Sequence, residues 1–353
     1  MPGFSLDALV RPHLLHMKPY RSARDEFRGN GMVFLDANEN NLGAVGGGPW
    51  NRYPDPLQLD LKSKVADYEG ISSNQVFLGN GSDEAIDLLM RLVCTPAEDQ
   101  IIVLPPTYGM YRVSANLNQI EVVEVPLRSD LSPDLEKIQA SITPRTKMIF
   151  FCSPNNPTGN TIALDDIYQI TQSFHGLVIL DEAYQDFSGT ASGVPLLKEL
   201  KNLVILRTFS KAWGLAGLRL GMAFASPELI AFLTKIKPPY NISGVTQTLA
   251  IQALEQVKEK ETFVHQIVTE RNRLFLHLQT LSGVASVIPS QANFLLVRFD
   301  RPARPLYEGL LEAGFVVRDR SHELHCQNGL RISIGTKAEN EALLLCLEKL
   351  LRH

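Results

Sequence analysis

Six short runs of apolar, largely β-branched residues, separated by segments with helical spacing, limit the folds open to this chain. The runs cover residues 101–104, 121–125, 147–152, 177–181, 203–207 and 221–225. Continuously apolar strands that alternate with helices are typical of a sheet buried on both faces. We therefore expect an α/β fold whose large domain contains a mostly parallel sheet with helices on both sides.

The pattern changes after residues 235–244. A long helical stretch follows, then expected strands over 292–299, 314–319 and 330–335, and a last helix that begins at a Thr336–Glu339 capping box. A chain of 353 residues favours two domains. We expect the following divisions: an N-terminal arm over 1–30 with one short helix, a large domain over 31–243 of which 31–50 could pack with the small domain, and a small α+β domain over 244–353.

Composition excludes several classes of function. The net charge is −4 and no run of Lys and Arg forms a basic stripe, so we expect no binding to nucleic acid. No apolar run approaches the length of a membrane span, and we find no signal peptide. The four cysteines form no C-x-x-C pair, which is typical of reduced thiols. We expect a soluble, cytoplasmic protein.

Lys211 is the first candidate catalytic residue. It follows the run 203–207, and ligands of open α/β sheets gather at the carboxyl ends of strands. Partial burial there would lower the pKa of the lysine and supply a neutral amine that can form a Schiff base. No G-x-x-x-x-G-K precedes Lys211, which excludes a P-loop, and an exposed lysine at a helix start is the alternative.

A carboxylate and an amide are expected near this lysine. Asp181 ends the run 177–181, where a carboxylate is costly unless it meets a cation such as a protonated pyridine, although it could instead cap a helix. Tyr184 follows closely enough to enter the same pocket. The turn 153–160, SPNNPTGN, could hold the Asn156 amide against a ligand oxygen, or could be only a turn.

A phosphate site is expected where a glycine-rich loop enters a helix. In residues 78–89, LGNGSDEAIDLL, backbone N–H groups near Ser82 and Asp83 could bind an anion, although Asp83 could be an ordinary N-cap. Ser210 and Arg219 could close on the same phosphate. A lysine, a buried carboxylate and a phosphate site together match pyridoxal 5′-phosphate. A Rossmann NAD enzyme is disfavoured because G-x-G-x-x-G is absent.

The motifs that carry these residues resemble those of the fold-type I pyridoxal-phosphate aminotransferases, and within them the histidinol-phosphate aminotransferase family. The matching segments run in order along nearly the whole chain: KPY, LDANENNLG, RYPDP, GNGSDE, PPTYGMY, SPNNPTGN, DEAYQDF, TFSKAWGLAGLRLG, FVVRD and GLRISIGT. The resemblance implies a large domain with a seven-stranded sheet. A regulatory protein that retains this fold without catalysis is disfavoured, since the chain leaves no room for a DNA-binding extension.

The resemblance also implies roles for single residues around the cofactor. Lys211 would form the Schiff base and move the substrate α-proton, and Asp181 would keep the pyridine nitrogen protonated. The other expected contacts are Asn156 and Tyr184 with the phenolic oxygen, Tyr108 stacked on the ring, and Ser210, Arg219, Ser82 and Asp83 around the phosphate. Tyr53 would reach the phosphate of a neighbouring subunit, which implies a homodimer.

For the substrate, the resemblance implies that Arg331 and Asn156 bind the acid group, with Tyr20 and Arg318 as helpers on a phosphate. The implied reaction of histidine biosynthesis converts imidazole-acetol phosphate and L-glutamate into L-histidinol phosphate and 2-oxoglutarate. The alternatives are an aromatic-amino-acid aminotransferase and a threonine-phosphate decarboxylase of the same fold. Arg318 could also be an exposed strand-end charge, and Tyr20 could simply pack the arm.

The segment 321–329 resembles no expected motif. Its His322, His325 and Cys326 superficially suggest metal ligands, but no fourth ligand has suitable spacing. We expect no metal site, and an exposed hairpin or loop in the small domain.

Overall fold

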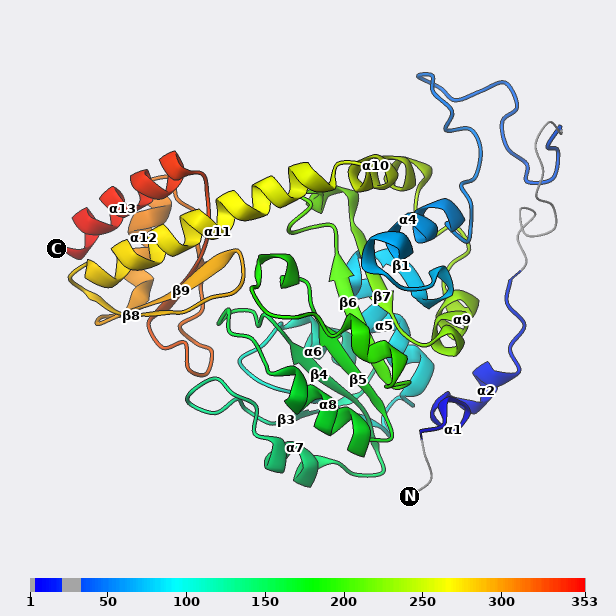
Figure 1. The fold of residues 1–353 in the computed structure, drawn as a ribbon, viewed down its shortest axis with the longest axis horizontal. Helices are drawn as coiled ribbons and strands as arrows, with labels where there is room; N and C mark the ends of the chain where they lie inside the picture. Colours follow the sequence, from blue (N-terminus) through cyan, green and yellow to red (C-terminus); the bar gives the residue numbers. More distant parts are fainter. Residues whose placement is uncertain (1–3, 21–32, 353) are drawn as a thin grey trace.

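A computed structural model of the chain describes residues 4–20 and 33–352. Two sheets organise this part of the chain, and the long helix α11 runs from one to the other (Figure 1). The strands of the larger sheet are β1 (Val76–Asn80), β2 (Gln100–Val103), β3 (Glu121–Glu124), β4 (Thr146–Cys152), β5 (Leu177–Asp181), β6 (Leu203–Thr208) and β7 (Leu220–Phe224). The smaller sheet contains β8 (Val284–Ile288), β9 (Phe294–Phe299), β10 (Arg318–Asp319) and β11 (Gly329–Ser333).

Helices occupy most of the segments between these strands. The α-helices are α1 (Leu6–Leu9), α2 (Pro12–Leu15), α4 (Leu59–Glu69), α5 (Gly81–Val93), α6 (Met110–Leu117), α7 (Leu135–Ser141), α8 (Leu164–Ser173), α9 (Pro227–Ile236), α10 (Gly244–Leu254), α11 (Val257–Thr280), α12 (Ala303–Glu312) and α13 (Lys337–Leu351). Short 3-10 helices are η1 (Ser73–Gln75), η2 (Gln185–Phe187), η3 (Val194–Lys198) and η4 (Ala216–Leu218).

The large sheet has the strand order β1-β7-β6-β5-β4-β2-β3. All neighbouring pairs from β6 to β3 are parallel, whereas β7 runs antiparallel to both β6 and β1. The predicted mostly parallel α/β architecture is therefore confirmed. The six apolar runs correspond to β2–β7, but the seventh strand, β1, was not found among them because its last residues, Gly79 and Asn80, read as the start of a glycine-rich loop.

Side chains of the central strands alternate between two separate hydrophobic cores. In β4, Met148 and Phe150 belong to the core that includes α5, α6 and α9, while Ile149 and Phe151 belong to the core that includes α4, α8 and α10. This alternation follows from the two-residue period of a strand. Both faces of the sheet are thus covered, and the carboxyl ends of the strands remain as the place for a site.

The small sheet is antiparallel throughout, in the order β10-β11-β9-β8. A core formed by α11, α12 and α13 with these strands supports it. The predicted capping box of α13 is present, since Thr336 accepts from the Glu339 amide and Glu339 accepts from the Thr336 amide. The division at residues 243 and 244 stays a prediction; Ala250 of α10 is buried in a core of the large sheet.

The described part of the N-terminal arm contains two four-residue helices rather than the single one expected. Leu9, Val10 and Leu14 are buried in the core beside α5 and α9. Lys235 of α9 donates to the carbonyl groups of Leu14 and Leu15, at 2.7 and 3.0 Å. This part of the arm is therefore packed on the large domain.

Candidate active site

Eight of the residues predicted for the site line one cavity at the carboxyl ends of β5 and β6. They are Ser82, Asp83, Tyr108, Asp181, Tyr184, Ser210, Lys211 and Arg219. The first residues of α5, which follow β1, line the same cavity as the residues after β5 and β6. Residues far apart in the sequence therefore meet there. The cavity contains a buried carboxylate at one end and cationic and hydroxyl groups at the other, as described below.

Asp181 is the last residue of β5 and is only 3% exposed. Its carboxylate accepts hydrogen bonds from the Tyr111 hydroxyl at 2.7 Å and from the Ala183 amide at 3.1 Å. Burial raises the pKa of Asp181 to about 6, against the effect of these two donors. A buried carboxylate of this kind is stabilised by a nearby cation, and a protonated pyridine nitrogen would provide one.

Tyr111 is the site residue that sequence reasoning missed. It is fully buried in α6, its ring stacks on Phe150 at 4.5 Å, and its hydroxyl points at Asp181. Tyr108, in the same PPTYGMY motif, stands edge-on to Tyr111 and donates to Asp83 at 3.1 Å. A buried tyrosine needs a hydrogen-bond partner, but neither the burial of Tyr111 nor its distant partner Asp181 is visible in the sequence.

Lys211 lies beside a connected set of polar side chains. Its Nζ atom is 5.5 Å from the ring centroid of Tyr184, whose hydroxyl accepts from Asn156 at 3.4 Å. The Asn156 side-chain oxygen in turn accepts from Arg331 of β11 at 2.5 Å. Burial, and then the positive charge of Arg331, lower the pKa of Lys211. A lysine in this environment can reach the neutral amine form more readily than one in water.

The turn that carries Asn156 is fixed by its neighbour. The Asn155 amide donates to the carbonyl of Pro106 at 2.8 Å and to Thr158 at 2.7 Å. These bonds tie the SPNNPTGN turn to the PPTYGMY segment. They explain how a loop holds Asn156, which is 5% exposed, in one place between Tyr184 and Arg331.

The opposite end of the cavity is built around glycines. Gly81 opens α5 with φ +71°, and a Cβ there would lie 2.9 Å from a terminal nitrogen of Arg219. A Cβ on Gly221 would lie 2.1 Å from the backbone nitrogen of Ser82. The first amides of α5, the Ser210 hydroxyl and the Arg219 guanidinium are the donor set that a phosphate requires. Together with Asp181 and Lys211, these residues fit pyridoxal 5′-phosphate.

Substitution of Gly221 by alanine is expected to disturb this phosphate cradle. The added methyl group would meet backbone atoms of Gly81 and Ser82, at 2.2 and 2.1 Å, and backbone cannot move aside as a side chain can. We expect weaker binding of pyridoxal 5′-phosphate, measured by fluorescence titration of the apoprotein. Gly217→Ala is the matched control, since its Cβ would meet nothing within 4 Å. Equal affinity of the two variants would contradict this account of the cradle.

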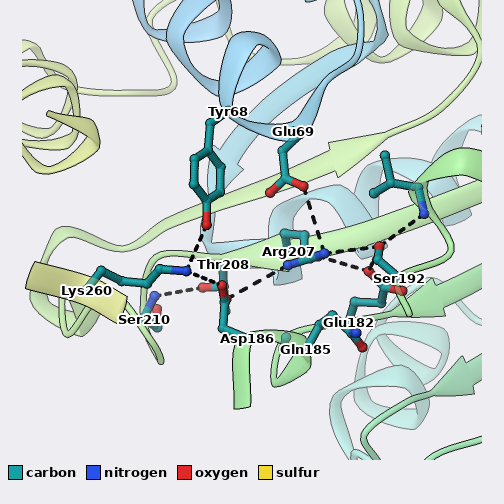
Figure 2. A network of polar contacts seen from close by, with 12 residues as sticks. Tyr68, Glu69, Glu182, Gln185, Asp186, Ser192, Arg207, Thr208, Ser210 and Lys260 are labelled. Carbon is teal, nitrogen blue, oxygen red and sulfur yellow. Dashed lines mark hydrogen bonds and ion pairs between the residues drawn. The ribbon is translucent and has the colours of Figure 1, made fainter. Parts of the chain in front are cut away.

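A buried network of ion pairs lies at the carboxyl ends of β5 and β6, outside the cavity. Arg207 of β6 donates to Glu182 at 3.0 Å and lies 3.9 Å from both Glu69 and Asp186. Lys260 of α11 donates to Asp186 at 2.6 Å and to Tyr68 at 2.8 Å. Figure 2 shows these side chains converging from α4, β6, α11 and the segment after β5 that includes η2. Ion pairs therefore hold Glu182, which follows Asp181, and Asp186, two residues beyond Tyr184.

Comparison with known proteins settles the family. The model of the family "Aminotransferase class I and II" matches residues 27–346 of this chain. The chain belongs to this aminotransferase family. A histidinol-phosphate aminotransferase of Cytophaga hutchinsonii is 48% identical over 342 residues, which cover 97% of this chain and 98% of the relative.

Solved structures give the same result for the fold. The histidinol-phosphate aminotransferase of Clostridium acetobutylicum has a TM-score of 0.79 and 25% identity, covering 86% of this chain and 91% of its own. That of Sinorhizobium meliloti, solved with pyridoxal 5′-phosphate, has a TM-score of 0.79 and 26% identity over 90% of each chain. The predictions of a fold-type I aminotransferase and of its cofactor are confirmed.

Three predicted residues of the aminotransferase lie away from the cavity. Tyr20 is 73% exposed and lies near residues 234–239, and Tyr53 is 51% exposed and stacks on Tyr240 at 4.5 Å. Arg318 is exposed in β10, directly opposite Arg331. The structure of one chain thus brings neither tyrosine to Lys211, and the roles implied for them stay predictions.

Residues 321–328 lie in the connection from β10 to β11, and Gly329 is the first residue of β11, so the segment is part of a hairpin as expected. It is not wholly exposed, because Cys326 is fully buried and His325 contacts the carbonyl of Leu127 at 3.0 Å. Among residues 4–20 and 33–352, no group of His, Cys, Asp and Glu could hold a metal ion. Over the same ranges no helix is long and apolar enough to cross a membrane.

Proposed function

We propose that this aminotransferase transfers the amino group of L-glutamate to imidazole-acetol phosphate, giving 2-oxoglutarate and L-histidinol phosphate, in cytoplasmic histidine biosynthesis. The observation that carries the proposal is Arg331, which lies next to the Lys211 cavity and is held by Asn156. Its guanidinium can bind either a carboxylate or a phosphate through paired oxygens. The 48% sequence identity to a histidinol-phosphate aminotransferase, over 97% of this chain, supports L-histidinol phosphate as the substrate.

The residues of the site divide the work of the reaction. When bound, pyridoxal 5′-phosphate supplies an electron sink that stabilises the charge left at the substrate Cα after its proton departs. The Lys211 amine, whose pKa burial lowers, takes that proton onto Nζ and would then donate it to the cofactor rather than back to Cα, so that the amino group can be transferred. Asp181 provides the negative charge that favours a protonated pyridine nitrogen, and Tyr111 holds that carboxylate in place. Arg331 binds and orients the acid group of each substrate in turn.

We also propose that the active unit is a homodimer. Tyr53 is half exposed, stacks on Tyr240, and does not line the cavity of its own chain. An aromatic side chain held at the surface in this way is available to a second subunit. The family resemblance of the RYPDP motif supports contact with the cofactor phosphate of that subunit.

The substrate is tested by comparing amino donors with 2-oxoglutarate as the acceptor. We expect L-histidinol phosphate to be the preferred donor, with kcat/KM at least about 10-fold above that of L-phenylalanine, because a charged hydrogen bond contributes about 1.5–3 kcal/mol. Glutamate formation is the readout, and release of CO2 from threonine phosphate is measured in parallel. Preference for phenylalanine would identify an aromatic aminotransferase, and CO2 release would identify a decarboxylase.

A further inference from the structure

We propose that Arg320 is a second anion-binding residue of the substrate site and that, beside Arg331, it selects a substrate that carries a phosphate. This inference rests on the proposed function, which it deepens by naming a specificity-determining residue. The position follows the two residues of β10, in a segment that sequence reasoning had not assigned to the site.

Strand register places Arg320 next to Arg331. Arg318 lies directly opposite Arg331 in the β10–β11 pair, and the Arg320 amide continues the pairing by donating to the carbonyl of Gly329 at 2.9 Å. Arg320 and Arg331 are therefore diagonal neighbours on the same face of the hairpin. Diagonal neighbours across antiparallel strands are about 7–8 Å apart, which long side chains span. One phosphate can thus meet both guanidinium groups.

The Arg320 side chain has a hydrogen-bond donor without an acceptor among the described residues. One terminal nitrogen donates to Glu323 at 2.6 Å, and about one fifth of the side chain is exposed. Its Nε–H is buried and meets no acceptor within the part of the chain that the structure describes. A buried N–H without an acceptor is costly, so an oxyanion that reached it would be bound favourably.

The charges around Arg331 match a dianion better than a single carboxylate. Arg318, Arg320 and Arg331 bring three positive charges to one face of the hairpin, against the negative charge of Glu323, while Asp319 alternates to the other face of β10. Burial lowers the pKa of Arg331, and the positive charges of Arg320 and Arg318 lower it further. Burial raises the pKa of Tyr184, and Arg331 and Arg320 oppose that rise. Arg320 therefore acts on the side of the hairpin that faces the cavity.

Glu323 makes the proposal testable, because two interpretations of its pair with Arg320 predict different effects of Glu323→Gln on anion binding. If Arg320 binds substrate phosphate, Glu323 competes with that phosphate and repels it. If the pair only fastens the turn after β10, each partner stabilises the hairpin and neither affects an anion. Arg304 and Glu308, an ion pair at 2.6 Å on the surface of α12, provide matched control substitutions.

The experiment titrates each holoenzyme with glycerol phosphate, followed by calorimetry, and measures KM for L-histidinol phosphate and L-glutamate. We expect Arg320→Gln to weaken phosphate binding and raise KM for histidinol phosphate by about 10- to 100-fold, the range for loss of one charged hydrogen bond. Glu323→Gln should tighten phosphate binding, and KM for glutamate should change much less. Arg304→Gln and Glu308→Gln should change neither the affinity for glycerol phosphate nor the KM of either substrate.

Unchanged phosphate affinity in both Arg320→Gln and Glu323→Gln would overturn the proposal. If Arg320→Gln does not fold, Glu323→Gln decides alone, since tighter binding supports the role and unchanged binding refutes it. Failure of the proposed function looks different: the unsubstituted enzyme would not use histidinol phosphate, whatever the effect of Arg320 on glycerol phosphate.

Discussion

Replacing Lys211 with alanine is expected to lower the rate of transamination by at least about 10³-fold while the protein still folds. Removal of a general base alone costs about 10²–10⁴-fold, and Lys211 would also lose its covalent role with the cofactor. Lys211 lies at the cavity wall rather than in a core, so its loss leaves no large void. The proton at the substrate Cα would then have no amine at hand to accept it.

The measurement is the single-turnover reaction with L-glutamate, followed by the absorbance of the bound cofactor. Lys211→Arg is an informative companion, because it keeps a positive charge that cannot be lost near neutral pH and should be nearly as inactive. Lys201→Ala, at an exposed position, should behave like the unsubstituted enzyme. Turnover of Lys211→Ala within 10-fold of that enzyme would remove the basis of the proposed mechanism.

The sequence predicted the strand-end residues of the site because their positions depend on local rules. Asp181 and Lys211 follow continuous apolar runs, and parallel strands bring such positions to one edge of a sheet. The direction of β7 was not accessible, since an apolar run of five residues looks the same in either direction. β8 was also missed, because only Val287 of its residues is buried and no continuous apolar run results.

Residues whose roles depend on distant partners were not predictable in this way. Tyr111 follows Tyr108 in one motif, but its partner Asp181 lies 70 positions away. Arg207 read as the last residue of an apolar run, and its carboxylate partners come from α4 and from the segment after β5 that includes η2. A pattern confined to one segment contains no information on such pairs, and only the folded arrangement reveals them.

Arg207→Met is expected to be the most destabilising of the substitutions considered, with a loss of about 3–5 kcal/mol in the free energy of unfolding. Burial acts to lower the pKa of Arg207, but Glu182, Glu69 and Asp186 outweigh it and the pKa is raised. The substitution keeps most of the side-chain volume and removes the charge. The buried carboxylate of Glu182, which accepts from Arg207 at 3.0 Å, would then lack its cation.

The loss of unfolding free energy in Arg207→Met should increase as pH rises. Burial already raises the pKa of Glu69 despite the opposing charge of Arg207, and removal of that charge would raise it further. A carboxyl group with a raised pKa in the folded state stabilises the fold when protonated, and that stability is lost as pH rises through the folded pKa. The difference from the unsubstituted protein should therefore be larger at pH 8 than at pH 5.

Urea unfolding of the apoprotein at both pH values measures this effect, with Arg304→Met as the control. Arg304 forms its ion pair with Glu308 at the surface, where water replaces the partner at little cost, so its loss should change stability little at either pH. A loss for Arg207→Met no greater than for Arg304→Met would show that the network does not stabilise the fold. A large loss that is independent of pH would mean that the vacated contacts, rather than the unpaired carboxylates, cause it. Because Glu182 adjoins Asp181 and Asp186 lies two residues beyond Tyr184, the expected result would also connect the stability of the sheet to the geometry of the site.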